Sequence, residues 1–123
     1  MRNTVLKLSF LCCSYLTPLT GTILHEIDTR EALKCSFSLN NLNRIAVDSG
    51  RLKKIICPEG YFSFRIEESS GQIFVFPIRD FAEAVTISVI TESALVQDLE
   101  LTVKKKPSEV VILFEPVDFD GSY

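Results

Sequence analysis

Residues 61–76 read YFSFRIEESSGQIFVF, and they carry the pattern of two short β-strands joined by a turn. Phe62, Phe64 and Ile66 alternate with polar side chains, and a strand directs alternate side chains to opposite faces. The polar stretch 68–71 ends in a glycine, which is typical of a hairpin turn. We therefore predict that the three apolar side chains face a core and that the polar residues between them face solvent.

The same two-residue period extends through most of the chain and predicts an all-β fold. Besides the strand at 62–66, the predicted strands lie at 33–39, 45–47, 51–57, 72–76, 85–89, 95–103 and 110–114. The predicted strand at 110–114 is a nearly continuous apolar run, which indicates burial on both of its faces. About eight short strands favour a single antiparallel β-sandwich, with a small barrel as the alternative. The flanking segments are predicted as a short amphipathic helix or an N-terminal arm (23–33) and a loose tail (115–123).

The composition limits the classes of function. With 123 residues, 46% hydrophobic and 24% charged, the chain has the size and apolar content of one folded domain. Its net charge is −3 without a strongly basic stretch, so the electrostatic pattern of a nucleic-acid-binding protein is missing. The single histidine, His25, lies outside the predicted strands and is interpreted as a solvated side chain. We predict no catalytic residue, no cofactor-binding residue and no metal ligand.

The N-terminal residues 1–22 read MRNTVLKLSFLCCSYLTPLTGT and have the layout of a secretory signal. Arg2 and Lys7 precede an apolar run at 8–19, which is too short for a membrane span of roughly 20 residues. The alternative is a buried N-terminal strand or helix of the domain. We predict a signal peptide over 1–22 and an exported β-sandwich domain over 23–123.

Removal of this segment would leave two cysteines, Cys35 and Cys57, in an oxidising compartment. An even pair in that setting permits a disulfide, and these two residues are the candidate pair. Both occupy strand-like positions, so two small buried thiols are the alternative. A disulfide requires Cα atoms within about 7 Å of each other, and the strand pattern leaves that distance open.

Residues 104–106 are three consecutive lysines that precede Pro107 and interrupt the strand pattern. Three neighbouring basic side chains fit an acidic partner. A short charge run before a proline is also typical of an exposed turn that discourages the pairing of strand edges. Both interpretations stay open.

A succession of short motifs carries a family resemblance. The motifs are Asn43-Arg44-Ile45 and the segments 50–55, 67–77, 87–92, 95–103 and 107–113. In this order and spacing they resemble the TraK-type proteins of conjugative type IV secretion systems, over residues 37–114. Two turns depart from the family pattern, because Ser93-Ala94 stands in place of a glycine and Ala84 in place of a proline.

The resemblance implies a periplasmic, secretin-like β-sandwich that acts in conjugation and pilus assembly. Such a subunit belongs to an outer-membrane core complex, where it forms a ring with a lipoprotein and an inner-membrane-spanning scaffold protein. The resemblance implies no enzyme activity, no direct contact with nucleic acid and only indirect association with the outer membrane. Family members normally carry a second, C-terminal β-domain, so the expectation is the N-terminal domain of a truncated or split subunit.

The segment Asn43, Arg44 and Ile45 is the candidate partner interface, because the resemblance is strongest there. The alternative places Ile45 in the core and leaves Arg44 as a solvated strand residue. Two other classes of function stay open. One is a free-standing secreted Ig-like module for binding or adhesion, and the other is a small exported enzyme, for which the set of site residues is poorest.

Overall fold

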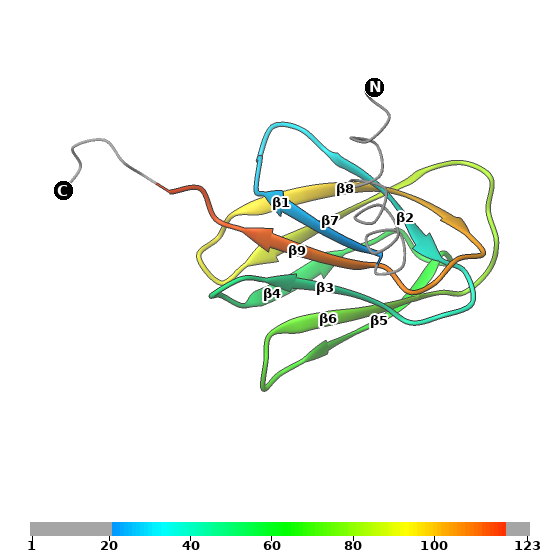
Figure 1. The fold of residues 1–123 in the computed structure, drawn as a ribbon, viewed down its shortest axis with the longest axis horizontal. Helices are drawn as coiled ribbons and strands as arrows, with labels where there is room; N and C mark the ends of the chain where they lie inside the picture. The colour runs from blue at the N-terminus through cyan, green and yellow to red at the C-terminus, as the bar shows by residue number, and fades with distance from the viewer. Residues whose placement is uncertain (1–20, 118–123) are drawn as a thin grey trace, which may run out of the picture.

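The computed structural model describes residues 21–117, which contain nine β-strands and no helix (Figure 1). The strands are β1 (Thr22–Glu26), β2 (Leu33–Ser38), β3 (Asn43–Val47), β4 (Leu52–Ile56), β5 (Phe62–Glu67), β6 (Gln72–Pro77), β7 (Val85–Thr91), β8 (Val96–Lys104) and β9 (Val110–Phe114). The all-β character of the prediction is confirmed. The predicted signal peptide, except for its last two residues, and the tail residues 118–123 lie outside the described residues.

The strands form two sheets, one of five strands in the order β1-β9-β3-β6-β5 and one of four in the order β2-β8-β7-β4. The sheets lie in two layers with the core between them (Figure 1). The prediction of about eight antiparallel strands is wrong in two respects. The structure has a ninth strand, and both sheets are mixed, because β1 and β3 pair with β9 in parallel and β2 pairs with β8 in parallel.

The unpredicted strand is β1, which lies in the segment predicted as a helix or an arm. It runs beside β9, with Thr22 opposite Val110 and Glu26 opposite Phe114. A segment of five residues is too short to show a clear hydrophobic period. Its partner strand comes from the far end of the chain, so the local sequence carries no signal for this pairing.

Aliphatic side chains that alternate along the strands fill the space between the sheets. The fully buried ones include Ile45, Ile73, Val75, Ile87, Val89, Leu99, Leu101, Val111 and Leu113. Phe37 from the smaller sheet meets Phe62 from the larger sheet edge to face, with 6.4 Å between the ring centroids. Both sheets therefore contribute to one continuous core.

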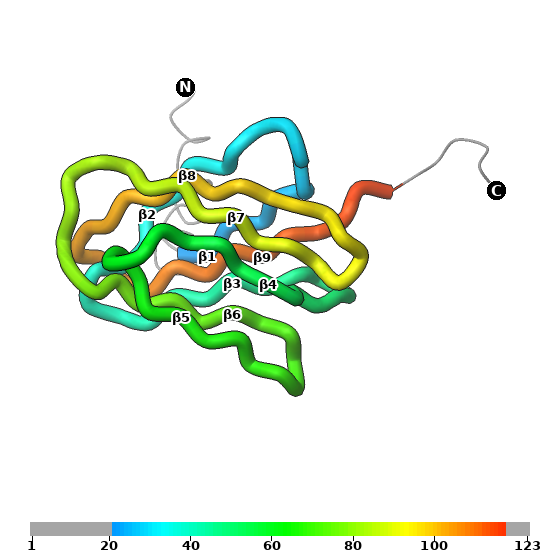
Figure 2. The backbone as a smooth tube through the Cα atoms, turned by 180° about the vertical axis from the view of Figure 1, so that it is seen from behind, coloured from blue at the N-terminus to red at the C-terminus, as the bar shows by residue number. Residues whose placement is uncertain are grey.

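Phe64 departs from the predicted burial. Phe62 is buried and Ile66 is half-buried, but the Phe64 side chain is 43% exposed. Its register partner Val75 is fully buried, so the orientation predicted for the strand is correct. The larger sheet has one strand more than the smaller sheet, and the β5–β6 hairpin at its edge projects from the body of the molecule (Figure 2). Phe64 stays exposed because the smaller sheet does not extend far enough to cover it.

Candidate interaction surface

Asn43, the first residue of β3, is completely buried. Its Oδ1 accepts hydrogen bonds from the backbone N–H groups of Ser38 (2.8 Å) and Glu109 (3.0 Å). Its Nδ2 group donates to the carbonyl oxygens of Ser38 (3.1 Å), Asn41 (3.2 Å) and Val75 (3.2 Å). These backbone groups belong to both sheets and to the segment that leads into β9. Asn43 therefore ties the two sheets together and presents no side-chain atom to a partner.

Arg44 and Ile45 follow in β3 and point to opposite faces of the larger sheet. Ile45 is fully buried in the core, in agreement with the alternative interpretation. Arg44 lies half-buried on the outer side of the sheet, where its Nη1 donates a hydrogen bond to Oε1 of Gln72 at 2.8 Å. Of the three candidate interface residues, Arg44 is the one whose side chain lies on a surface.

Cys35 and Cys57 are free thiols. Cys35 lies in β2 and Cys57 follows β4, and these strands form the opposite edges of the four-stranded sheet. At ordinary strand spacing the two edges are about 14 Å apart, whereas a disulfide requires Cα atoms within about 7 Å. The candidate disulfide is therefore not formed. Burial, with a smaller contribution from the Glu109 carboxylate, raises the pKa of the Cys35 thiol to about 12.

His25 lies in β1, opposite Leu113 of β9, so its interpretation as a solvated arm residue is wrong. Its Nε2 atom is buried and has no hydrogen-bond partner among the described residues. His25 also lines an open cavity of about 530 Å³ together with Glu26, Asp28 and Arg30.

The outer side of the five-stranded sheet carries a surface that we call the outer apolar face. Its residues alternate with core residues of the same strands and are Leu24, Ala46, Phe74, Phe76, Val110, Ile112 and Phe114, together with Leu42 just before β3. Leu24, Ile112 and Ala46 form a row across three neighbouring strands. Leu24 is 70% exposed and Leu42 is 52% exposed. Within residues 21–117 no third layer covers this side of the sheet (Figures 1 and 2).

The outer side of the four-stranded sheet has the opposite character. Polar side chains on neighbouring strands form hydrogen bonds there, namely Ser36 of β2 with Thr102 of β8 (2.8 Å) and Ser88 of β7 with Asp98 of β8 (2.5 Å). The apolar residues on this side are fewer, namely Ile56 in β4, the half-buried Ile90 in β7 and Val96 in β8, opposite Ile90. The contrast between the two sheets makes the outer apolar face the candidate contact surface.

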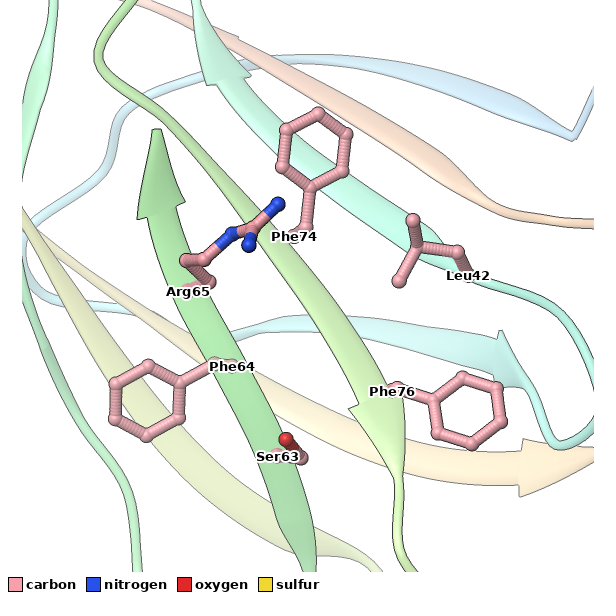
Figure 3. Close-up of a pocket in the computed structure, with 6 residues that line it drawn as sticks. All are labelled: Leu42, Ser63, Phe64, Arg65, Phe74 and Phe76. Atoms are coloured by element: carbon pink, nitrogen blue, oxygen red, sulfur yellow. The ribbon is translucent and has the colours of Figure 1, made fainter. Parts of the chain in front are cut away.

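A groove lies where the outer apolar face meets β5. Its volume is about 480 Å³, and it is lined by Leu42, Ser63, Phe64, Arg65, Phe74 and Phe76 (Figure 3). In Figure 3 the Arg65 side chain extends toward Phe74, whereas Phe64 points away from β6. The groove thus combines aromatic surface with one charged side chain.

The candidate site of the described residues is a surface, formed by the outer apolar face and the groove beside it. Residues 21–117 contain no group of three or more His, Cys, Asp and Glu residues that could hold a metal ion. In the same range there is no helix that is long and apolar enough to cross a membrane. An open apolar face with arginines on it suits the binding of another protein.

One sequence feature, the apolar run 110–114, belongs to the outer apolar face, but the strand pattern alone does not show whether its outer side is covered. Residues 110–114 form an apolar run that was predicted to be buried on both sides. The structure buries Val111 and Leu113 but leaves Phe114 37% exposed. A continuous apolar strand fits either a strand between two layers or a strand whose outer side meets a partner. Only the arrangement of the sheets distinguishes these cases.

Comparison with known families matches residues 26–119 to the TraK N-terminal domain. The match spans more than half of the 123 residues, and it confirms the resemblance found in the sequence. Comparison with curated proteins found no match. TraK-type transfer proteins are structural rather than catalytic. The chain therefore belongs to the family of TraK N-terminal domains, which relates it to conjugal transfer and type IV secretion.

Proposed function

We propose that this protein is a structural subunit of the outer-membrane core complex of a type IV secretion system and works in the periplasm. It acts by protein–protein assembly, in a ring with a lipoprotein and an inner-membrane-spanning scaffold protein. The outer apolar face carries this proposal, because soluble monomers rarely leave a large contiguous apolar patch without a binding role. Membership of the TraK N-terminal domain family supplies the secretion context.

The size of the face is consistent with one part of a stable interface. Strands about 4.8 Å apart and about 17 Å long give the five-stranded sheet a face of roughly 400 Å². A standard interface buries about 800 Å² on each partner. The face therefore supplies about half of the area, and the remainder comes from the rim and the strand edges.

Arg44 is the proposed polar contact at the centre of this face. It stands in register between Val110 of β9 and Phe74 of β6. A guanidinium among apolar side chains favours a partner that brings a carboxylate or carbonyl oxygen, because charge-assisted hydrogen bonds strengthen as water is excluded. Arg44 thereby gives the apolar contact its specificity.

The test is co-purification of the full chain with co-expressed lipoprotein and scaffold components, followed by light scattering. Leu24→Asp and Arg44→Glu place negative charge on the outer apolar face. Thr86→Asp and Lys34→Glu are matched changes at exposed positions on the outer side of the smaller sheet. We expect the first two variants to lose co-purification by about tenfold or more, as charge repulsion at an interface does, and the matched variants to keep it.

Thermal melts followed by circular dichroism establish that each variant is folded. A wild-type chain that stays monomeric and binds no secretion component would overturn the proposal and favour a free-standing binding module. Equal losses from both sheets would overturn the assignment of the contact to the outer apolar face.

A further inference from the structure

On the basis of this assembly function, we propose that the free edge of β5 binds an extended acidic segment of a partner subunit as an additional β-strand. The segment would alternate apolar and acidic side chains. Its apolar side chains would lie beside Phe64, and one of its carboxylates would face Arg65.

The β5 edge is open to strand addition. β5 is the last strand of its sheet and pairs only with β6, so half of its backbone N–H and C=O groups point away from the sheet. Its register with β6 runs without interruption from Phe62 to Glu67. An edge with regular geometry is a template for another strand.

The corresponding edge of the smaller sheet is protected in ways that β5 is not. β4 carries Lys53 and Lys54, and its register with β7 shifts between Leu52 and Lys54. Lysines and bulges are the devices by which proteins prevent strand addition at an edge. β5 contains neither a lysine nor a register shift. The regular edge and the protected edge lie at the same side of the sandwich, where β4 and β5 are in contact.

The side chains of β5 determine which segment fits. Phe64 points to the inner side of the sheet, yet it is 43% exposed because the smaller sheet does not cover it. An added strand would bury Phe64 with its own inward apolar residues. On the outer side, the small residue Ser63 leaves room beside the aromatic groove for a neighbouring side chain. Because of Phe64, apolar residues are favoured at the inward positions of the bound segment, which are every second position along it.

The charge near the groove favours an acidic segment. Arg44, Phe74 and Arg65 stand in one row across β3, β6 and β5, so two cations flank one aromatic ring. The guanidinium of Arg65 has no hydrogen bond or ion pair with another residue in the part of the chain described by the structure. The carboxylate on the same strand, Glu67, accepts hydrogen bonds from Ser69 and Ser70, and these bonds lower its pKa.

A carboxylate from a partner would thus meet Arg65 without competition from this chain. The fork of donors on a guanidinium matches the two oxygens of a carboxylate. Because an added strand places a residue directly opposite each residue of β5, the position of this acid fixes the register of the bound segment.

The probe for the test is a fluorescein-labelled peptide of nine residues in which valine or phenylalanine alternates with glutamate. Its binding to the full chain is measured by fluorescence anisotropy. A second peptide carries lysine in place of glutamate, and a third is N-methylated at alternate residues, which removes backbone donors but keeps the side chains. We expect each altered peptide to bind at least about tenfold more weakly, as expected when a charge contact or several backbone hydrogen bonds are lost.

The protein variant is Arg65→Glu, and its matched control is Arg30→Glu. Arg30 lies between β1 and β2, and its side chain is 91% exposed. We expect Arg65→Glu to weaken binding of the glutamate peptide by about tenfold or more and the control to change it by less than about twofold, because the reversed charge lies at the contact in the first case only.

Equal binding of the glutamate and lysine peptides, or no effect of N-methylation, would overturn the proposal. Self-association of the wild-type chain that is lost in Arg65→Glu would assign the β5 edge to a second copy instead. If Arg65→Glu fails to bind the peptide but co-purifies with the secretion components like wild type, strand addition at β5 is refuted while the proposed function stands. If the wild-type chain binds the peptide but no secretion component, the proposed function is refuted while strand addition at β5 stands.

Discussion

Replacement of Asn43 by alanine should destabilise the fold more than its position at the start of a strand suggests. The amide makes five hydrogen bonds, all to backbone groups, and no water reaches it because the residue is completely buried. Asn43→Ala leaves the N–H groups of Ser38 and Glu109 without this acceptor. It also leaves the carbonyl oxygen of Val75 without this donor.

The expected loss follows from the number of buried groups left without partners. A buried donor or acceptor without a partner costs about 1 to 3 kcal/mol. Two N–H groups dominate, since a carbonyl oxygen in a β-ladder can keep its other hydrogen bond. The loss for Asn43→Ala is therefore about 3 to 5 kcal/mol, a large fraction of the roughly 5 to 15 kcal/mol that stabilises a typical domain.

Asn43→Asp separates the two halves of this network. The aspartate keeps an oxygen for the N–H groups of Ser38 and Glu109 but cannot donate to carbonyl oxygens while it is ionised. It also places a charge in a buried site, so we expect a loss of similar size. Asn40→Ala is the control, because Asn40 is exposed in the same loop and the Ser38 hydroxyl that donates to its Oδ1 also donates to the carbonyl oxygen of Lys106, so the expected loss is about 0.5 kcal/mol.

The measurement is urea unfolding of the full chain, followed by far-ultraviolet circular dichroism. The free energies of unfolding are compared between variants whose unfolding free energy falls with urea concentration at the same slope. A changed slope would indicate a changed unfolded or native state. A loss below about 1 kcal/mol for Asn43→Ala, which is the range of an ordinary surface substitution, would refute the role of Asn43 as the tie between the sheets.

Three further predictions concern the edge strand, the thiols and one turn. Phe64→Ala should cost about 1 to 2 kcal/mol, less than the 3 to 5 kcal/mol expected for Phe62→Ala, because Phe64 is only partly buried; equal losses in urea unfolding would contradict this. Iodoacetamide should modify Cys57 well before Cys35 at pH 8, since burial raises the pKa of Cys35 to about 12; equal rates by mass spectrometry would contradict it. Gly71→Ala should lower the free energy of unfolding by at least about 1 to 2 kcal/mol, because φ is 70° at this position and alanine disfavours that conformation. The added Cβ would also stand 2.6 Å from Cβ of Arg51. An unchanged thermal midpoint would contradict this prediction.

The sequence predicts the local part of this fold well and the non-local part poorly. Alternation locates the β5–β6 hairpin and orients Phe62 and Phe64 correctly, because the faces of a strand are set by adjacent residues. Parallel pairing of β1 with β9 joins two ends of the chain and leaves no mark on either segment. The exposure of Phe64 likewise depends on the number of strands in the opposite sheet.

The candidate interface shows the same limit at the level of single residues. The motif Asn43-Arg44-Ile45 carries the resemblance to the family, yet two of its three side chains are buried. A motif resemblance cannot separate residues that hold a fold together from residues that contact a partner, since both kinds occur on one strand. The outer apolar face was missed because its residues come from four strands and from the loop before β3.

The alternation along β3 gives a physical way to separate these two roles. Asn43 and Ile45 point inward and act on the free energy of unfolding, whereas Arg44 and Ala46 point outward to the face that we propose for assembly. An inward change would weaken assembly by lowering the amount of folded subunit, so conditions that stabilise the fold would restore it. An outward change would leave folding intact and weaken the contact itself, so the bound fraction would stay low at any level of stability. Because neighbouring residues of one strand differ in this way, unfolding and co-purification measured on the same variants distinguish support of the fold from contact with a partner.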